Sequence, residues 1–198
     1  RIYSNYKSQK YLNMISEIFK SKSLIKNNIF NKATKLAKLS GKILALSISK
    51  RKIFGIQSIN LVGFSLGCQV IKSFLKELSV LSKDDETGEI NEGLCNIIQN
   101  VIFFGGAVDF KKNKKWGDIF QTMVAGKIHN FYSNNDEVLK KLYPISSTNN
   151  KGTPIGIKKL ENNYCNKIFN TDVSNKIDGH MSYSNFMDSI MENTEFDR

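Results

Sequence analysis

The spacing of the hydrophobic residues changes near residue 53, which divides the chain into two parts. Before this point, apolar residues recur every three to four positions, as on one face of a helix. The first such run contains Tyr11, Leu12, Ile15 and Phe19. We therefore expect a helical N-terminal segment over residues 1–52, followed by a second part over residues 53–198.

A second helical pattern within this segment runs from Ala33 to Leu44. Asn31 precedes it and is a residue type that commonly caps a helix N-terminus, so we expect this helix to begin there and to end near residues 50–52. Gly41 lies inside the pattern, at a cost of about 1 kcal/mol relative to alanine. A close approach between this helix and a sheet would explain the glycine.

Four short apolar runs of strand length follow, and helical patterns separate them. The runs cover residues 58–64, 100–104, 127–133 and 167–170, and the helical patterns cover residues 66–81, 110–125, 138–143 and 183–190. Strands that alternate with helices are typical of βαβ units and a mostly parallel sheet. The pattern predicts an α/β protein with an exposed loop at residues 83–93 and a loop-rich stretch at residues 144–165.

A five-residue motif joins the first strand to the following helix. Gly63-Phe64-Ser65-Leu66-Gly67 matches the G-x-S-x-G nucleophile elbow, in which a tight turn presents a serine hydroxyl at the end of a sheet. The tightness of the turn predicts that only glycine fits two residues before and after the serine. A plain glycine-rich turn is the alternative, but the strand before and the amphipathic helix after favour the elbow.

A nucleophilic serine needs a base, and the chain has two histidines. His129 falls inside the third strand, where a half-buried structural role is expected. His180 lies between the last strand and the last helix, which is where an α/β-hydrolase places its base. We therefore predict His180 as the base, although a lone loop histidine is otherwise an ordinary surface residue.

The acid should follow the strand just before the one that leads to the histidine, so that the chain order is Ser, Asp, His. Asp136 comes directly after the strand that ends at Ser133 and meets this condition. It would hold the tautomer of His180 and stabilise the imidazolium. The competing interpretation is a helix N-cap. Asp109, after the previous strand, is the reserve candidate for the acid.

The sequence identifies one of the two N–H donors that an oxyanion hole needs. The backbone N–H of Leu66, next to the nucleophile, would supply one donor, and a loop after an earlier strand should supply the second. No strand and loop of that kind are visible before residue 53. We therefore expect a single but incomplete domain: the C-terminal portion of an α/β-hydrolase fold without its N-terminal strands. Such a fragment should be a poor catalyst and a marginal folder on its own.

The formal charge of +11 changes this picture little. Arg1, Arg51 and Arg198 are the three arginines among 29 basic residues, and the lysines are spread along the chain. Nucleic-acid-binding proteins usually gather arginine and aromatic residues on one element, so we expect no nucleic-acid partner. The densest basic cluster, at residues 111–115, is interpreted as a solvated loop rather than a phosphate or anionic-lipid contact.

The three cysteines, Cys68, Cys95 and Cys165, are widely spaced and odd in number. No CxxC or Cys/His spacing typical of a metal site occurs, so no metal and no cofactor are expected. Unpaired cysteines fit a reducing compartment. Cys68 is expected to be a small core residue of the helix after the elbow.

At these residues the chain resembles the hydrolase-like domain of the transmembrane and coiled-coil domain-containing protein 4 family, long labelled a domain of unknown function. The resemblance runs from about residue 33 to residue 191. It rests on several ordered motifs: residues 59–67, 101–107 and 124–128, Trp116, Asn135-Asp136 with Leu139, and Gly179-His180-Met181-Ser182-Tyr183. It implies an α/β-hydrolase fold, a serine hydrolase activity, and Ser65, Asp136 and His180 in the triad positions.

The resemblance also implies membrane association, because family members carry a membrane-embedding apolar segment before the nucleophile strand. Residues 1–30 here are lysine-rich and cannot span a bilayer. We therefore expect any anchor in a missing upstream segment, with this portion facing the cytoplasm.

The function predicted from the sequence is hydrolysis of an ester through an acyl-enzyme on Ser65, with lipid esters among the candidate substrates. Trp116, Phe120 and Met123 are candidates for an acyl pocket, although such residues at helical spacing are more often core. The main alternative is a non-catalytic interaction module of the same fold, in membrane traffic or as a scaffold. A third hypothesis is a lysine-rich surface that binds anionic lipid without chemistry.

Overall fold

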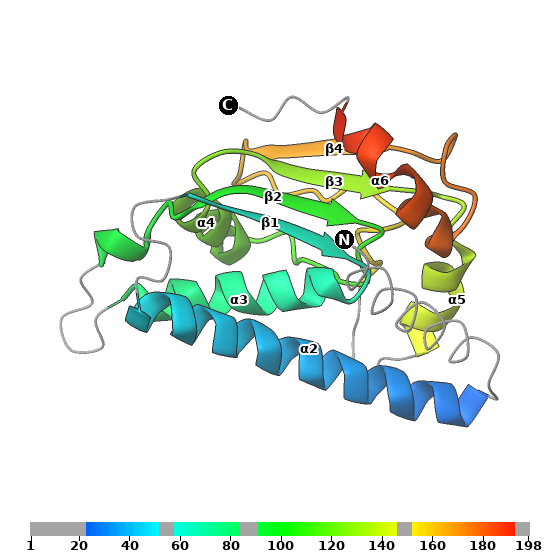
Figure 1. The fold of residues 1–198 in the computed structure, drawn as a ribbon, viewed down its shortest axis with the longest axis horizontal. Helices are drawn as coiled ribbons and strands as arrows, with labels where there is room; N and C mark the ends of the chain where they lie inside the picture. Colours follow the sequence, from blue (N-terminus) through cyan, green and yellow to red (C-terminus); the bar gives the residue numbers. More distant parts are fainter. Residues whose placement is uncertain (1–22, 52–57, 84–90, 146–151, 193–198) are drawn as a thin grey trace, which may run out of the picture.

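Four parallel strands form one sheet, in the same order in space as along the chain (Figure 1). In this computed structural model, which describes residues 23–51, 58–83, 91–145 and 152–192, the strands are β1 (Ile59–Phe64), β2 (Ile98–Phe104), β3 (Ile128–Tyr132) and β4 (Ile168–Asp172). Each coincides with one of the four apolar runs to within two residues at its start. The predicted α/β class and parallel sheet are therefore confirmed.

β1 occupies one edge of this sheet. Its Phe64 lies opposite Phe104 of β2, and in the described part of the chain no strand pairs with its other side. All four strands point the same way, so their carboxyl ends meet at one edge of the sheet (Figure 1). This edge carries the loops that follow β1, β2, β3 and β4.

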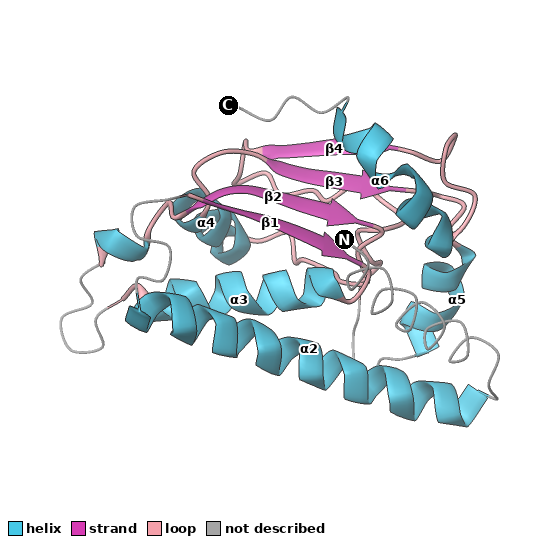
Figure 2. Ribbon diagram, viewed as in Figure 1, coloured by secondary structure: helices cyan, strands magenta, loops and turns pink. Residues whose placement is uncertain are grey.

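Helices cover both faces of the sheet (Figure 2). α3 (Gly67–Leu81) and α4 (Lys114–Met123) lie on one face, α6 (Tyr183–Glu192) lies on the other, and α5 (Glu137–Ile145) lies beyond the carboxyl ends of the strands. The short 3₁₀ turns are η1 (Glu92–Leu94) and η2 (His180–Ser182). α2 (Ser23–Arg51) runs along the outside of α3 (Figure 1).

Each face of the sheet packs against its own hydrophobic core, because alternate residues of a strand point to opposite faces. Val101 and Phe103 of β2 belong to the main core with α3 and α4. Ile102 and Phe104 of the same strand belong to a second core, together with Tyr183 and Ile190 of α6.

Gly41 marks the contact between α2 and α3. A Cβ atom at this position would lie 2.3 Å from the carbonyl oxygen of Val70 and 2.7 Å from Cβ of Ser73, both in α3. The close approach predicted for this glycine is therefore real, but the partner is a helix and not the sheet. α2 reaches the main core through Ala45 and Ile48.

The helix boundaries differ from the predictions at two places. α2 begins at Ser23, so Asn31 lies inside the helix and does not cap it. Inside a helix, asparagine costs less than about 1 kcal/mol relative to alanine, and the packing of α2 against α3 outweighs this cost. α4 begins only at Lys114, because the side chain of Asn113 accepts a hydrogen bond from the Trp116 N–H at 3.1 Å and caps the helix there. The helix expected around residues 11–19 lies outside the described residues.

Candidate active site

Ser65 sits in a strained turn between β1 and α3. Its φ angle is +53°, in the left-handed region that side-chain-bearing residues rarely adopt. Its N–H donates to the carbonyl of Phe104 at 3.0 Å, and its own carbonyl accepts from the Ala107 N–H at 3.0 Å. These bonds to the end of β2 hold the turn, so the serine hydroxyl lies at the carboxyl edge of the sheet.

The two glycines of the motif are not equivalent. A Cβ atom on Gly63 would lie 2.8 Å from Cδ1 of Ile71 and 3.0 Å from the backbone nitrogen of Cys68, so a side chain does not fit there. A Cβ atom on Gly67 would meet no atom within 4 Å. The expectation that the turn needs glycine on both sides is therefore wrong for Gly67, because α3 leaves open space at its first residue.

His180 belongs to η2, at the start of the turn that leads into α6. Its Nε2 atom lies 2.7 Å from the Oγ atom of Ser65, a hydrogen-bonding distance between residues 115 positions apart in the chain. The imidazole is 2% exposed and stacks on the ring of Phe64, with the two ring centroids 4.9 Å apart. Phe64 is the motif residue that the sequence left without a role.

Asp136 completes the chain of contacts. Its Oδ2 atom lies 2.6 Å from Nδ1 of His180, and its Oδ1 atom accepts a hydrogen bond from the Leu139 N–H at 2.9 Å. The carboxyl group is fully buried. One oxygen therefore caps α5, as the competing interpretation predicted, and the other contacts the histidine.

These contacts fit the tautomer of His180 that carries its proton on Nδ1. In this tautomer the Nδ1–H group can donate to an oxygen of Asp136, and Nε2 is left as the acceptor for the Ser65 hydroxyl. The geometry can support proton transfer from Ser65 to His180, with Asp136 holding the ring in place.

A second set of hydrogen bonds ties the two loops of the site together. The Ser133 hydroxyl donates to the carbonyl of Ile177 at 2.7 Å and accepts from the Asn135 N–H at 3.1 Å. The Asn135 side chain donates to the carbonyl of Ser174 at 2.8 Å. The turn that carries Asp136 is thereby fixed to the loop that precedes His180, through side chains for which the sequence predicted no role.

Buried neutral groups lie behind the site. Tyr183 is fully buried. Its ring packs so closely on Gly105 that a Cβ atom added to this glycine would lie 2.7 Å from it. Gly105 also has a φ angle of +48°, in the left-handed region that favours glycine. Burial raises the pKa of the Tyr183 phenol and that of the Cys68 thiol, so both stay neutral. Cys68 is a core residue, as predicted from the sequence.

Leu66, the predicted oxyanion donor, is the N-cap residue of α3, with φ −67° and ψ −18°. The first N–H groups of a helix have no acceptor within the helix, and the partial positive charge of the helix N-terminus favours an anion there. The Leu66 N–H therefore lies next to Ser65 at the end of a helix where negative charge is stabilised.

Asp109, the reserve candidate for the acid, lies in a different environment. Its carbonyl accepts a hydrogen bond from the Lys72 ammonium, and its carboxylate lies against Gly152. Both ring nitrogens of His180 already contact Asp136 and Ser65. Burial lowers the pKa of Lys72 to about 8, although the negative charge of Asp109 acts in the opposite direction and raises it. The Lys72 ammonium lies 5.1 Å from the centroid of the Phe110 ring.

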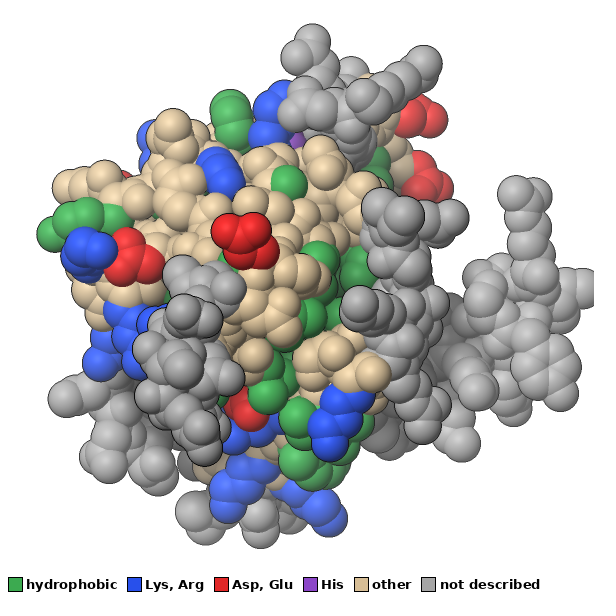
Figure 3. All heavy atoms as spheres, turned by 90° about the vertical axis from the view of Figure 1, so that its left-hand side faces the viewer, with side chains coloured by type: hydrophobic (Ala, Val, Ile, Leu, Met, Phe, Trp, Pro, Cys, Tyr) green, Lys and Arg blue, Asp and Glu red, His purple; other side chains and the backbone are tan. Residues whose placement is uncertain are grey.

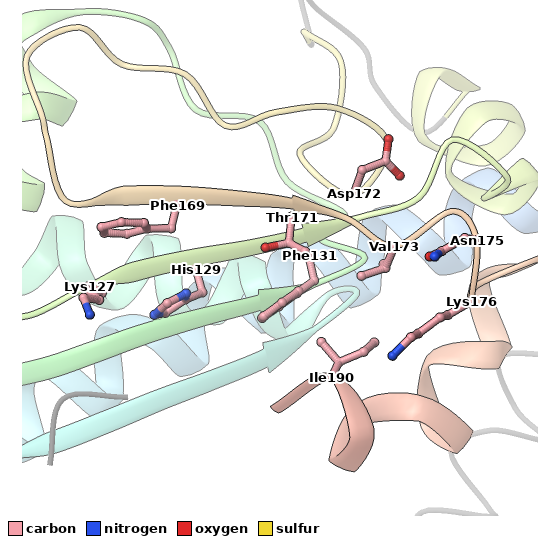
Figure 4. Close-up of a pocket in the computed structure, with 10 residues that line it drawn as sticks. All are labelled: Lys127, His129, Phe131, Phe169, Thr171, Asp172, Val173, Asn175, Lys176 and Ile190. Carbon is pink, nitrogen blue, oxygen red and sulfur yellow. The ribbon is translucent and has the colours of Figure 1, made fainter. Parts of the chain in front are cut away.

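His129 is part of β3 and is 6% exposed, and its ring stacks with Phe131 and Phe169. It is therefore a strand histidine, as predicted, although more deeply buried than expected. It lines a pocket of about 470 Å³ on the face of the sheet that carries α6 (Figure 4). The pocket is bounded by β3, β4 and α6, and Ser65, Asp136 and His180 are not among its lining residues.

Trp116, Phe120 and Met123 belong to the main core between α4 and the sheet. This is the plain-core interpretation of these residues. The three cysteines are unpaired thiols. Among the helices that the structure describes, none has both the length and the apolar character needed to cross a bilayer.

Comparison with known proteins finds relatives of low but significant similarity. The chain is 31% identical to an uncharacterized membrane protein of Schizosaccharomyces pombe over 86% of its own length, and 32% identical to the transmembrane and coiled-coil domain-containing protein STS1 of Oryza sativa over 79%. It is 30% identical to the probable lipase MIL1 of Saccharomyces cerevisiae over 85% of its length. These matches cover 20%, 21% and 14% of the three relatives, so the chain spans about a fifth of their length or less.

No solved structure matches the chain significantly. A family model, described as protein of unknown function (DUF726), matches residues 15–197. This match covers nearly all of the chain, including the strands and the residues around Ser65. The chain therefore belongs to the DUF726 family.

Proposed function

We propose that this chain is the α/β-hydrolase-fold domain of a serine hydrolase that cleaves carboxylic esters in the manner of an esterase or lipase. The observation that carries the proposal is the continuous hydrogen-bonded chain of Ser65, His180 and Asp136, with N–O distances of 2.7 and 2.6 Å. The three residues come from three separate loops at one edge of the sheet, in the order Ser, Asp, His. Catalytic roles for these residues are part of the proposal.

In the first half of the reaction, the Oγ atom of Ser65 attacks the ester carbonyl carbon while its proton moves to Nε2 of His180. The Leu66 N–H donates to the oxyanion of the tetrahedral intermediate. The bond between carbon and the alcohol oxygen then breaks, and His180 returns the proton to the leaving alcohol. In the second half, His180 activates a water that hydrolyses the acyl-enzyme and restores Ser65.

Asp136 would act throughout by orientation and charge. Its buried carboxylate faces the ring nitrogen that does not contact the serine, so it stabilises the imidazolium that forms in each half of the reaction. Phe64 stacks on the ring and limits its rotation. The probable-lipase name of the Saccharomyces cerevisiae relative supports an ester of lipid character as the substrate.

A fluorophosphonate probe tests this proposal, because it reacts quickly only with an activated serine. We expect the protein to be labelled at Ser65, and Ser65→Ala and His180→Ala each to abolish labelling. Ser184→Ala, an exposed serine on α6, and His129→Gln serve as matched controls that should keep it. Labelling that persists in Ser65→Ala contradicts the assignment. A folded wild-type protein that is not labelled would instead support a non-catalytic interaction module.

A further inference from the structure

The outward face of α2 is apolar, although the helix already buries its other side. Ala37, Gly41, Ala45 and Ile48 are buried on the side that faces α3. At 100° per residue, the opposite side carries four large residues with exposed fractions of 38–55%. We name these four the outer stripe: Leu36, Leu39, Ile43 and Leu46.

The outer stripe is unusual within the described residues. Six of the eleven exposed large hydrophobic residues there belong to α2, which is one of five described helices. Ile43 and Leu46 also border a shallow groove with Ser47 and Lys50. Figure 3 shows hydrophobic and basic (Lys or Arg) side chains next to one another at the lower end of the molecule, where α2 lies in Figure 1.

The charge of α2 points to the kind of surface that this face contacts. The helix contains no Asp or Glu. Lys32 and Lys50 are eighteen residues apart, which is five helical turns, so both lie in line with the outer stripe at its two ends. Lys35 is exposed along one flank, and Lys42 on the same flank lies 3.7 Å from Glu77 of α3.

We propose that the outer stripe docks the protein on an anionic lipid bilayer, with Lys32, Lys35 and Lys50 at the headgroups. An apolar helix face bordered by lysines lies in the plane of a membrane interface, with its apolar residues at the boundary of headgroups and acyl chains. Lysine side chains can reach from that depth back to the phosphates. A second copy of this helix would bring the same lysines together and is disfavoured by charge.

This docking is independent of the chemistry at Ser65. α2 contacts α3 on its inner side, and none of Ser65, Asp136 and His180 lies on α2. Ser65→Ala should therefore bind vesicles as the wild type does, and failure of the proposed hydrolase function would leave the docking unaffected.

A fluorescent amino acid that senses its environment, placed genetically at position 39 of the full-length protein, tests the docking directly. We expect its emission to shift to the blue with vesicles that contain phosphatidylserine and not with pure phosphatidylcholine. The same amino acid at position 80 is the matched control, because Val80 is equally exposed but lies on α3. Its emission should not shift.

Lysine variants test the role of charge. Each Lys→Gln change at positions 32, 35 and 50 should lower the affinity for the anionic vesicles about fivefold, and all three together about a hundredfold. Lys141→Gln, an exposed lysine on α5, should have no effect. The proposal is overturned if position 39 does not respond, if it responds equally to neutral vesicles, or if its emission is already blue without vesicles, which would indicate a covering protein segment.

Discussion

Two aspartates follow neighbouring strands of the same sheet, yet only one of them reaches the histidine. Asp136, after β3, is fully buried and contacts His180 at 2.6 Å. Asp109, after β2, is partly exposed and lies beside Lys72 and Gly152. Both are carboxylates at the carboxyl end of a parallel strand, so residue type alone does not separate them.

The difference lies in what each turn is tied to. Ser133 and Asn135 bond the Asp136 turn to the loop that delivers His180. The segment after β2 is bonded instead to the chain around Ile155, whose N–H donates to the carbonyl of Val108 at 2.8 Å. A carboxylate thus becomes a partner for the histidine through contacts made by its neighbours.

Replacing the carboxylate of Asp136 should affect the site more than any other single change. Asp136→Asn should lower the fluorophosphonate labelling rate by about 10⁴-fold, because an amide at this position favours the wrong tautomer of His180. Asparagine caps helices as well as aspartate does, so α5 should keep its cap and the protein its fold. Labelling rates and circular dichroism of the two proteins measure this.

Asp109→Asn is the matched control and should label at the wild-type rate. If the two variants exchange their phenotypes, the acid follows β2 and the assignment of Asp136 is wrong.

The next effect concerns the tie between the two loops. Ser133→Ala removes the hydrogen bond to the Ile177 carbonyl and should lower the free energy of unfolding by about 1–3 kcal/mol. The carbonyl then keeps only a longer bond, at 3.4 Å, from the Asn135 side chain, and the Asn135 N–H loses the hydroxyl as its acceptor. The substitution should slow labelling less than Asp136→Asn does, since the carboxylate itself remains. Urea denaturation and labelling of the same preparation test both statements. Full stability in the variant would show that the other bonds between the loops suffice.

In the region around Asp109, the low pKa of Lys72 should make the free energy of unfolding depend on pH. The pKa of Lys72 in the folded protein is about 8, below its ordinary value of 10.5. Between these values the unfolded chain binds a proton that the folded chain lacks, so Lys72 makes the free energy of unfolding rise with pH, by at most about 1.4 kcal/mol per pH unit. Lys72→Met should remove this rise.

Urea denaturation of both proteins from pH 8 to pH 10 gives the comparison. Burial raises the pKa values of Cys68, Tyr143 and Tyr183, which makes stability fall with pH in both proteins. Only the difference between wild type and variant therefore isolates Lys72. Parallel curves would mean that its ammonium is not desolvated.

The smallest effect concerns the motif itself. Gly67→Ala should stabilise the protein by about 0.5 kcal/mol, because a Cβ atom meets open space there and alanine restricts the unfolded chain. Labelling at Ser65 should not change. Gly63→Ala is the contrast: overpacking against Ile71 should cost about 1–3 kcal/mol. Thermal melts of the two variants measure the difference, and equal losses would mean that the turn needs both glycines.

Most of the fold could be predicted from the sequence. The four strands, the helix after the elbow and the parallel arrangement follow from the change of hydrophobic period and from the alternation of elements, which are local signals. The boundaries of α2 and α4 were less predictable. Packing against α3 overrides the signal of Asn31, and the cap at Asn113 is decided by a single hydrogen bond.

For the candidate site, the sequence determined the residue types and their order: a serine in an elbow, then an aspartate and a histidine after later strands. The order of the strands also favoured Asp136 over Asp109, but the neighbouring residues that bring Asp136 to His180 appear only in the folded structure. The same is true of the stacking of Phe64 on the ring and of the steric need for glycine at position 63 and not at position 67. The physical reason is the distance along the chain over which each kind of interaction acts. Periodicity and turn chemistry act over a few residues, whereas these contacts join side chains that come together only when the sheet, its two cores and the loops at its carboxyl edge have formed.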